Sequence, residues 1–297
     1  MKYQKSVSIL ILFIAMLSLL AGIMGILSMG GSGTQAFISL NGDTVYLYGK
    51  GIYINDSVAV AAQAIAQDWV TVVLGIPLLI LSFIFSTKKS LRARILLAGT
   101  IAYFLYTYMS YSFLCMYNPL FLVYVALMSM CFFALILVLI SFDLQLIKKA
   151  FSDDLPVKTI GILIIVFACA IALMWLGRIV PPLINGEIPS GLDHYTTLVI
   201  QAMDFGFVIP VSILSSILLM RRKPVGLLLS SVMCMKGATM LTSLTVMVIN
   251  QALAGVKMSI AEIVIFPVAN LLVLFGVFVF MKKIKEPKAT ASSLNIT

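Results

Sequence analysis

Long apolar runs separated by short polar stretches dominate this chain of 297 residues. A helix needs roughly 20 apolar residues to cross a hydrocarbon layer of ~30 Å. Runs of about that length occupy eight stretches, at 7–29, 69–86, 95–116, 120–142, 158–178, 196–220, 225–249 and 259–281. The pattern predicts an all-α integral membrane protein built as a bundle of eight transmembrane helices.

The connection between the first two runs has a different pattern. In "AFISLNGDTVYLYGKGIYI", apolar and β-branched residues flank Asn41-Gly42, a dipeptide suited to a type I′ turn. This segment predicts a small extracytoplasmic β-hairpin. One of residues 55–57 can cap the helix that follows. No breaker intervenes before Pro77, so we expect this helix to run from about Ser57 straight into the second span.

The pattern indicates one domain. Residues 1–288 form the eight-helix transmembrane domain, with its outer loop at 30–56, and residues 289–297 form a cytoplasmic tail expected to be disordered. The first run exceeds the ~7 to 15 apolar residues of a signal peptide, which favours a membrane anchor. The alternative is a cleaved first span, which would leave seven spans and a new amino terminus outside.

Composition and charge agree with this reading. Apolar residues make up 62% of the chain and charged residues 10%, which excludes an ordinary soluble domain. With the amino terminus inside, 16 of the 20 basic residues fall on the cytoplasmic side. We therefore expect a protein of the cytoplasmic membrane with both termini in the cytoplasm. Its net charge of +9 then faces anionic lipids and requires no nucleic-acid partner.

The sequence contains no recognisable catalytic or metal-binding motif. His194 is the single histidine, and the four cysteines all fall inside predicted spans without a CxxC pair. We therefore expect no metal site, no cofactor and no catalytic residue, and the pattern leans against an enzyme. No inverted repeat of the kind found in many secondary transporters is visible.

Polar residues inside the apolar runs are the candidates for function, because a charge at mid-bilayer is costly unless it is paired or hydrated. In the sixth run they form a stripe on one helical face. Pro210 in the same run also leaves the carbonyl of Gly206 without its helical donor. The stripe consists of His194, Thr197, Gln201, Asp204, Ser212 and Ser215.

The seventh and eighth runs carry the other intramembrane candidates. Lys236 lies in the middle of the seventh run with Thr239 on its face, and Glu262 and Asn270 lie in the eighth. Together with Gln201 and Asp204 they are expected to form an intramembrane polar core.

A lysine this deep in a span requires a partner. Asp204 and Lys236 lie on antiparallel neighbouring helices, and their depths differ by ~7 Å, about the length of a lysine side chain. The sequence therefore predicts an intramembrane ion pair between them. Two interpretations stay open. The pair either joins two helices and has no role in transport or catalysis, or lines a water-accessible cavity or ion pathway.

A second group of polar residues is expected at the outer mouth of the bundle. It comprises Gln63, Gln67, Asp68 and His194. We expect the hairpin to lie over this mouth, formed by the second, sixth and eighth helices. The third run is rich in tyrosine, and the deeper tyrosines, Tyr106 among them, must find buried hydroxyl partners.

Several blocks of the chain resemble a set of prokaryotic polytopic membrane proteins. They are "YGKGIYINDSVAVAAQAIAQD", "AYFLYTYMSYSF", "MYNPLFLVYVAL", "DHYTTLVIQAMDFG" and "KGATM", which together span most of the chain. The resemblance implies a multispan membrane fold and no particular activity.

Three classes of function remain open. The polar core around Lys236 and Asp204 favours transport, or an ion or proton pathway. The alternatives are a non-catalytic sensor or accessory subunit that uses the hairpin, and a lipid-modifying enzyme at the outer surface. The ligand would be a small solute or a lipid-like molecule.

Overall fold

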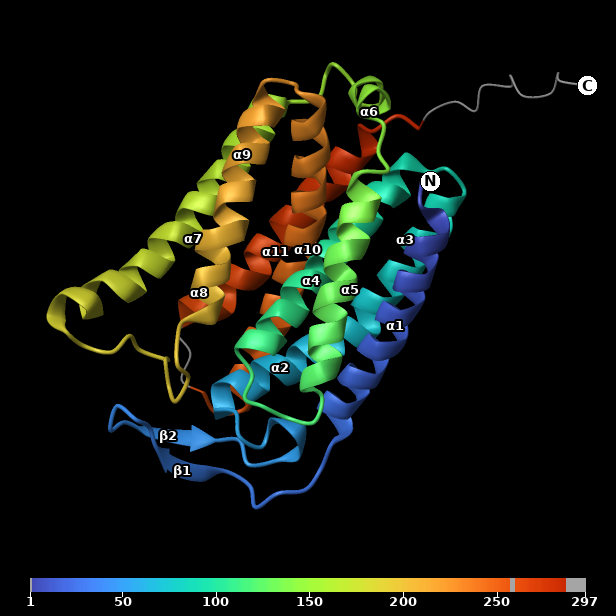
Figure 1. The fold of residues 1–297 in the computed structure, drawn as a ribbon. Helices are drawn as coiled ribbons and strands as arrows, with labels where there is room; N and C mark the ends of the chain where they lie inside the picture. Colours follow the sequence, from blue (N-terminus) through green and yellow to red (C-terminus); the bar gives the residue numbers. More distant parts are fainter. Residues whose placement is uncertain (1, 257–259, 287–297) are drawn as a thin grey trace, which may run out of the picture.

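The computed structural model is a bundle of long helices closed at one end by a small hairpin (Figure 1). It describes residues 2–256 and 260–286, apart from the side chains of 261, 262 and 279. Seven of the described helices are long and apolar enough to cross a membrane. The expected tail at 289–297 lies outside the described residues.

The elements follow the predicted order, with short additional helices. Their bounds are α1 Gln4–Leu27, β1 Gln35–Ile38, β2 Thr44–Leu47, η1 Gly51–Tyr53, α2 Val58–Val70, η2 Thr71–Gly75, α3 Ile76–Thr87, α4 Leu91–Phe113, α5 Phe121–Leu139, α6 Leu144–Ala150, α7 Val157–Asn185, α8 Val199–Met203, η3 Asp204–Val208, α9 Ile209–Met220, α10 Pro224–Leu253 and α11 Ile260–Lys282.

Two of the long helices contain a π-helical turn. α2, η2 and α3 form one continuous helix over Val58–Thr87, as predicted, and the Ser57 side chain caps it by accepting from the Val60 amide. α8, η3 and α9 likewise form one helix over Val199–Met220. Each π turn ends just before a proline, Pro77 or Pro210, at the start of the next segment. The wider turn accommodates the carbonyl that the proline leaves without a donor.

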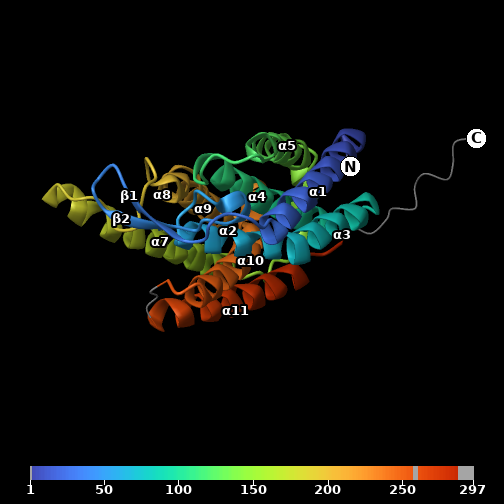
Figure 2. The ribbon, with the colours of Figure 1, turned by 90° about the horizontal axis from the view of Figure 1, so that it is seen from below.

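The predicted third span is the one that the seven apolar helices do not include. It corresponds to α4, a 23-residue helix whose tyrosines, threonines and serines make it less apolar than its neighbours. α4 packs against α3, α5 and α10, so these polar side chains face protein. Figure 2, viewed along the bundle, shows α4 near the middle.

The predicted hairpin is present. β1 and β2 pair antiparallel, with Phe37 opposite Val45, and Gly42 in the turn has φ +87°, which glycine adopts without strain. The hairpin lies across the ends of α2 and α8 in Figure 1. We call this the hairpin end of the bundle. The first described residues and the end of α11 lie at the opposite end.

The two halves of the chain repeat the same arrangement. Thr71–Gly75 and Asp204–Val208 are both π turns, and the second lies 133 positions after the first. The same offset, 133, relates α3 to α9 and the start of α4 to the start of α10. Within it, "IPLLILSFI" at 76–84 and "IPVSILSSI" at 209–217 agree at six of nine positions.

Part of the packing follows the same repeat, although α1 also packs on α5 and no packing of similar extent joins α7 to α11 in the described residues. α1 packs on α2 and α3 as α7 packs on α9, and α4 packs on α5 as α10 packs on α11. Both copies run in the same direction, so this is a parallel repeat and not an inverted one. α6 joins the halves.

The halves meet where α4 crosses α10. A Cβ atom added to Gly99 would lie 2.3 Å from the Met235 Cβ and 3.1 Å from the Val232 carbonyl oxygen. Gly99 and Val232 are equivalent positions of the repeat, 133 apart, so equivalent segments of the two halves meet at this contact. A side chain larger than hydrogen does not fit at Gly99 without a shift.

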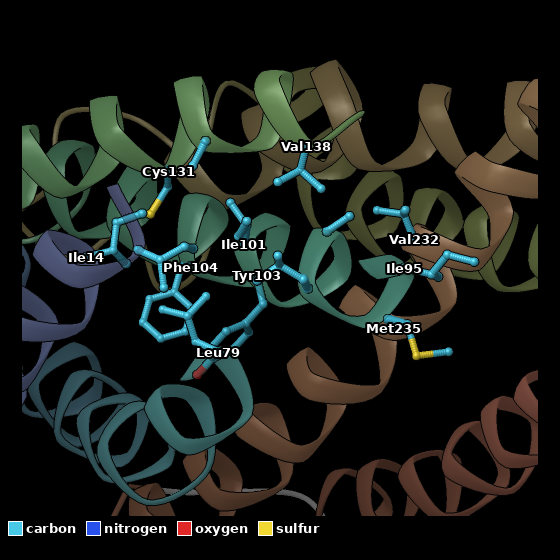
Figure 3. Close-up of a cluster of buried hydrophobic side chains, with 14 of the residues drawn as sticks. Ile14, Leu79, Ile95, Ile101, Tyr103, Phe104, Cys131, Val138, Val232 and Met235 are labelled. Atoms are coloured by element: carbon cyan, nitrogen blue, oxygen red, sulfur yellow. The ribbon is translucent and has the colours of Figure 1, made fainter. Parts of the chain in front are cut away.

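The hydrophobic core lies along α4. Ile95, Ile101 and Phe104 of α4 are fully buried between Leu79 of α3 and Cys131 of α5. Figure 3 shows this cluster, with Val232 and Met235 of α10 on its other side. The apolar residues of α7 and α11 are mostly exposed on the outside of the bundle, where a membrane protein contacts lipid.

Candidate functional site

The carboxyl group of Asp204 lies inside the bundle, at the start of the second π turn. Its side chain is buried, ~8 Å along the helix from the start of α8. Tyr106 of α4 donates its hydroxyl to Oδ1 at 2.9 Å, and Trp175 of α7 donates its indole N–H to Oδ2 at 2.8 Å. Two neutral donors from two other helices therefore fix this carboxyl group.

The ammonium group of Lys236 contacts the ring face of the same tyrosine. Lys236 is buried in the middle of α10, and its Nζ is 4.1 Å from the centroid of the Tyr106 ring. A cation over a desolvated aromatic ring gains about 2 kcal/mol or more. Tyr106 therefore contacts the cation with its ring face and the carboxyl group with its hydroxyl.

The predicted direct ion pair between Lys236 and Asp204 is wrong. Both residues are described, and the only ion pair found among the described residues joins Lys283 and Asp154 at the opposite end. The helices are neighbours, as expected, and Tyr106 contacts both residues, the carboxyl group with its hydroxyl and the ammonium group with its ring face. The depths of two residues along neighbouring helices predict that they lie near each other. They do not show that a side chain from a third helix, here Tyr106 of α4, contacts both.

A second polar cluster surrounds Gln67 in the first half. Its Nε2 donates to the Tyr103 hydroxyl at 2.6 Å and to Thr107 Oγ1 at 2.8 Å, and its Oε1 accepts from the Ser243 hydroxyl of α10. The Thr71 hydroxyl lies 3.3 Å from that of Tyr103. Thr71 and Tyr103 are the repeat equivalents of Asp204 and Lys236, 133 positions earlier in both cases.

The other members of the expected polar core are only partly brought together. Thr239 donates to carbonyls of its own helix, and Gln201 is buried in α8. Asn270 of α11 accepts from the Thr242 hydroxyl, which links α11 to α10 away from Lys236. Glu262 belongs to α11, but its side chain lies outside the described part of the structure.

The expected outer mouth is divided between two places. Gln67 and Asp68 are buried inside the bundle, with exposed fractions of 1% and 3%, and do not open onto its hairpin end. The helix begins at Val58, so both lie nearly three turns below its start. Gln63, one turn nearer the end, is half-buried.

His194 is found at the hairpin end, as expected. Its Nε2 is 2.8 Å from the Asn55 carbonyl oxygen, and its ring packs edge-on against Phe37 of the hairpin. Next to it, the Tyr195 hydroxyl donates to Asp56 Oδ1 at 3.0 Å and accepts from the Ser57 amide. The hairpin end is therefore closed by contacts between 35–57 and 186–198.

Asp56 holds this closure together. Its Oδ1 also accepts from the Met116 amide, which follows α4, so one carboxyl group joins three segments. Burial raises the pKa of Asp56 to about 6, against the hydrogen bonds from Met116 and Tyr195, which lower it. Burial raises the pKa of the Tyr195 hydroxyl, and the proximity of Asp56 raises it further.

Two residues of the Asp204 site were not predicted in their roles. Tyr106 was expected to find a buried partner, but nothing indicated which one. Trp175 lies near the end of its apolar run, where a tryptophan ordinarily marks the membrane interface. The described residues contain no group of three or more His, Cys, Asp or Glu side chains that could hold a metal ion.

Comparisons with protein-family models, with curated proteins and with solved structures gave no match to this chain.

Proposed function

We propose that the chain crosses the cytoplasmic membrane eight times, with both termini in the cytoplasm and the hairpin end outside. The seven apolar helices and the 23-residue α4 support this count. The basic residues support the orientation, because they gather at the end opposite the hairpin. The resemblance to prokaryotic multispan proteins is consistent with it and stays a prediction.

Within this membrane protein, Asp204 binds and releases a proton in a transport cycle or proton pathway. One observation carries this proposal. The buried carboxyl group of Asp204 is held by two neutral donors, and it forms no ion pair with Lys236, which contacts the ring face of Tyr106.

A direct salt bridge would support helix attachment instead, because it fixes a carboxylate in its charged form. At Asp204 the carboxyl group is held by two hydrogen bonds from neutral donors and by no ion pair with a described basic residue. A proton on Asp204 weakens it as an acceptor, so protonation loosens the contact that joins α4 and α7 to the π turn.

Proton flux into liposomes tests the proposal. The purified protein is reconstituted with a pH-sensitive dye inside, and a potassium diffusion potential drives protons inward. We expect flux from the wild type and loss of most of it in Asp204→Asn, which keeps an acceptor but binds no proton. Asp154→Asn is the matched control, because Asp154 is an exposed carboxylate at the opposite end.

Two results would count against the proposal. Equal flux from Asp204→Asn and wild type would remove Asp204 from the pathway. A wild type that is folded and passes no protons under any applied gradient would contradict a proton pathway and favour an accessory role, in which the polar core only joins helices.

A further inference from the structure

A second carboxyl group, that of Asp68, is buried in the first half of the bundle. The Tyr53 hydroxyl lies 2.6 Å from its Oδ2 and the Tyr111 hydroxyl lies 2.9 Å from its Oδ1. The backbone of α1 covers it, since a Cβ atom added to Gly25 would lie 1.7 Å from Oδ2. Asp68 is therefore enclosed by α1, η1 and α4.

No described basic residue forms an ion pair with Asp68. The titratable groups around it are Tyr53, Tyr103, Tyr108, Tyr111, Tyr124 and Cys115. All are neutral hydroxyl or thiol groups in their ordinary state. An ionised carboxylate without a cation in such surroundings costs several kcal/mol.

The hydrogen-bond partners of Tyr111 indicate where a proton lies. Its hydroxyl oxygen is 2.9 Å from the Ala64 carbonyl oxygen and 2.9 Å from Asp68 Oδ1. A tyrosine hydroxyl has one hydrogen, and the Ala64 carbonyl can only accept. All contacts are full hydrogen bonds only if Tyr111 donates to Ala64, Asp68 donates from Oδ1 to Tyr111, and Tyr53 donates to Oδ2.

The repeat places Asp68 on the same helical face as Asp204. Asp68 is equivalent to Gln201, and Thr71 is equivalent to Asp204, each pair being 133 positions apart. Asp204 is the first residue of the second π turn, and Asp68 lies three residues before the first, so the two carboxyl groups are about one helical turn apart in the repeat. Each half therefore carries one buried carboxyl group on its π-containing helix.

We infer that Asp68 is a second proton-binding site, protonated in the resting protein, so that each half binds one proton. The link to transport rests on the proposed function of Asp204. The protonation of Asp68 does not, because it follows from the contacts of Asp68 alone. The site binds a proton and no larger ligand, since Gly25, Tyr53 and Tyr111 fill the space around it.

Infrared spectroscopy of the full-length protein tests this inference. At about pH 8 exposed carboxyl groups are ionised, so a carbonyl band of protonated carboxylic acid reports buried groups. The protein is measured in a detergent without ester carbonyls, in H₂O and in D₂O. We expect Asp68→Asn to lose a band that shifts in D₂O, and Asp204→Asn and Asp154→Asn to keep it. Asparagine donates and accepts at the same positions as a protonated aspartate, so the fold should tolerate it.

Tyr111→Phe gives an independent readout, because it keeps the carboxyl group and removes the acceptor of its proton. We expect the same band to move to higher frequency. A spectrum that is unchanged by Asp68→Asn, or a wild type without any such band, would overturn the inference. If the band depends on Asp68 while no variant alters proton flux, the proposed function fails and the Asp68 site stands.

Discussion

Tyr106 determines how the buried charges of the second half interact, because one side chain contacts both Asp204 and Lys236. Its hydroxyl and its ring face can be removed separately. Tyr106→Phe removes the donor to Asp204 and keeps the ring, whereas Tyr106→Leu removes both. This distinction separates the contact through Tyr106 from the direct ion pair that the sequence predicted.

We predict that Tyr106→Phe lowers the free energy of unfolding by about 1.5–3 kcal/mol, the usual value of a hydrogen bond to a charged group. Tyr106→Leu should lower it by about 2 kcal/mol more, because the cation–π contact is also lost. Unfolding of micelle-solubilised protein by increasing denaturing detergent measures both. In a Lys236→Met background the two variants should become nearly equal. If Tyr106→Phe and Tyr106→Leu lower the free energy of unfolding equally when Lys236 is present, the cation–π contact does not contribute to stability.

Asp56 gives a prediction about pH. Its pKa is about 6 in the folded protein, above the 3.8 of a free aspartate, because it is buried. The folded state then binds the proton more tightly than the unfolded state between these values. Stability is therefore highest at low pH and falls as pH rises from about 4 to 6, by about 3 kcal/mol for this group alone.

The thermal midpoint of Asp56→Asn, compared with the wild type at pH 5 and at pH 7.5, isolates this effect. From pH 5 to pH 7.5, the thermal midpoint of the wild type should fall more than that of Asp56→Asn, because asparagine does not titrate. An identical pH dependence in both proteins would show that Asp56 has an ordinary pKa.

At the scale of elements, the close crossing of α4 and α10 is the contact most sensitive to size. Gly99→Ala places a Cβ atom 2.3 Å from that of Met235, so one helix must shift. We predict a loss of about 1–3 kcal/mol, as for other overpacked cores.

Gly237→Ala is the matched control for Gly99→Ala. Gly237 lies on α10 next to Lys236, and no neighbouring atom lies within 4 Å of an added Cβ. Alanine there should be neutral or stabilising by up to about 1 kcal/mol, because it favours the helix. A thermal unfolding curve compares them. Equal effects would contradict a tight crossing at Gly99.

Elements were predicted better than the contacts between them. The apolar runs, the Asn41-Gly42 turn and the cap at Ser57 all depend on local sequence, and the structure contains each of them. The polar face of Lys236 was also identified. The Tyr106 ring, the Trp175 donor and the burial of Asp68 depend on residues distant in sequence, brought together by packing that no local pattern encodes.

At the scale of the whole molecule, the parallel repeat changes how the candidate site is understood. Only short stretches such as 76–84 and 209–217 keep similar sequences, so the repeat is evident mainly in the coincidence of π turns, prolines and helix starts. Thr71 and Tyr103 in the first half correspond to Asp204 and Lys236 in the second. The same positions therefore carry hydroxyl side chains in one half and an acidic and a basic side chain in the other.

The proposed topology predicts the labelling of two sites. A cysteine placed at Asn41, in a variant whose four native cysteines are replaced by serine or alanine, should react with a membrane-impermeant maleimide in intact cells. A cysteine appended at the carboxyl end should react only after the cells are opened. Reaction of the second site in intact cells, or protection of the first, would contradict an eight-span protein with both termini inside.

The central claim is that the buried Asp204 exchanges a proton with water, and Trp175 can report it directly. The chain has two tryptophans, and Trp69 is half exposed on the outside of the bundle, so Trp69→Phe leaves Trp175 as the only one. Because the Trp175 indole donates to Asp204, its fluorescence should change in a single titration as pH is varied on the reconstituted protein. We predict that Asp204→Asn abolishes this titration while Asp68→Asn leaves it in place. A Trp175 signal that does not respond to pH, or that titrates identically in Asp204→Asn, would contradict the account.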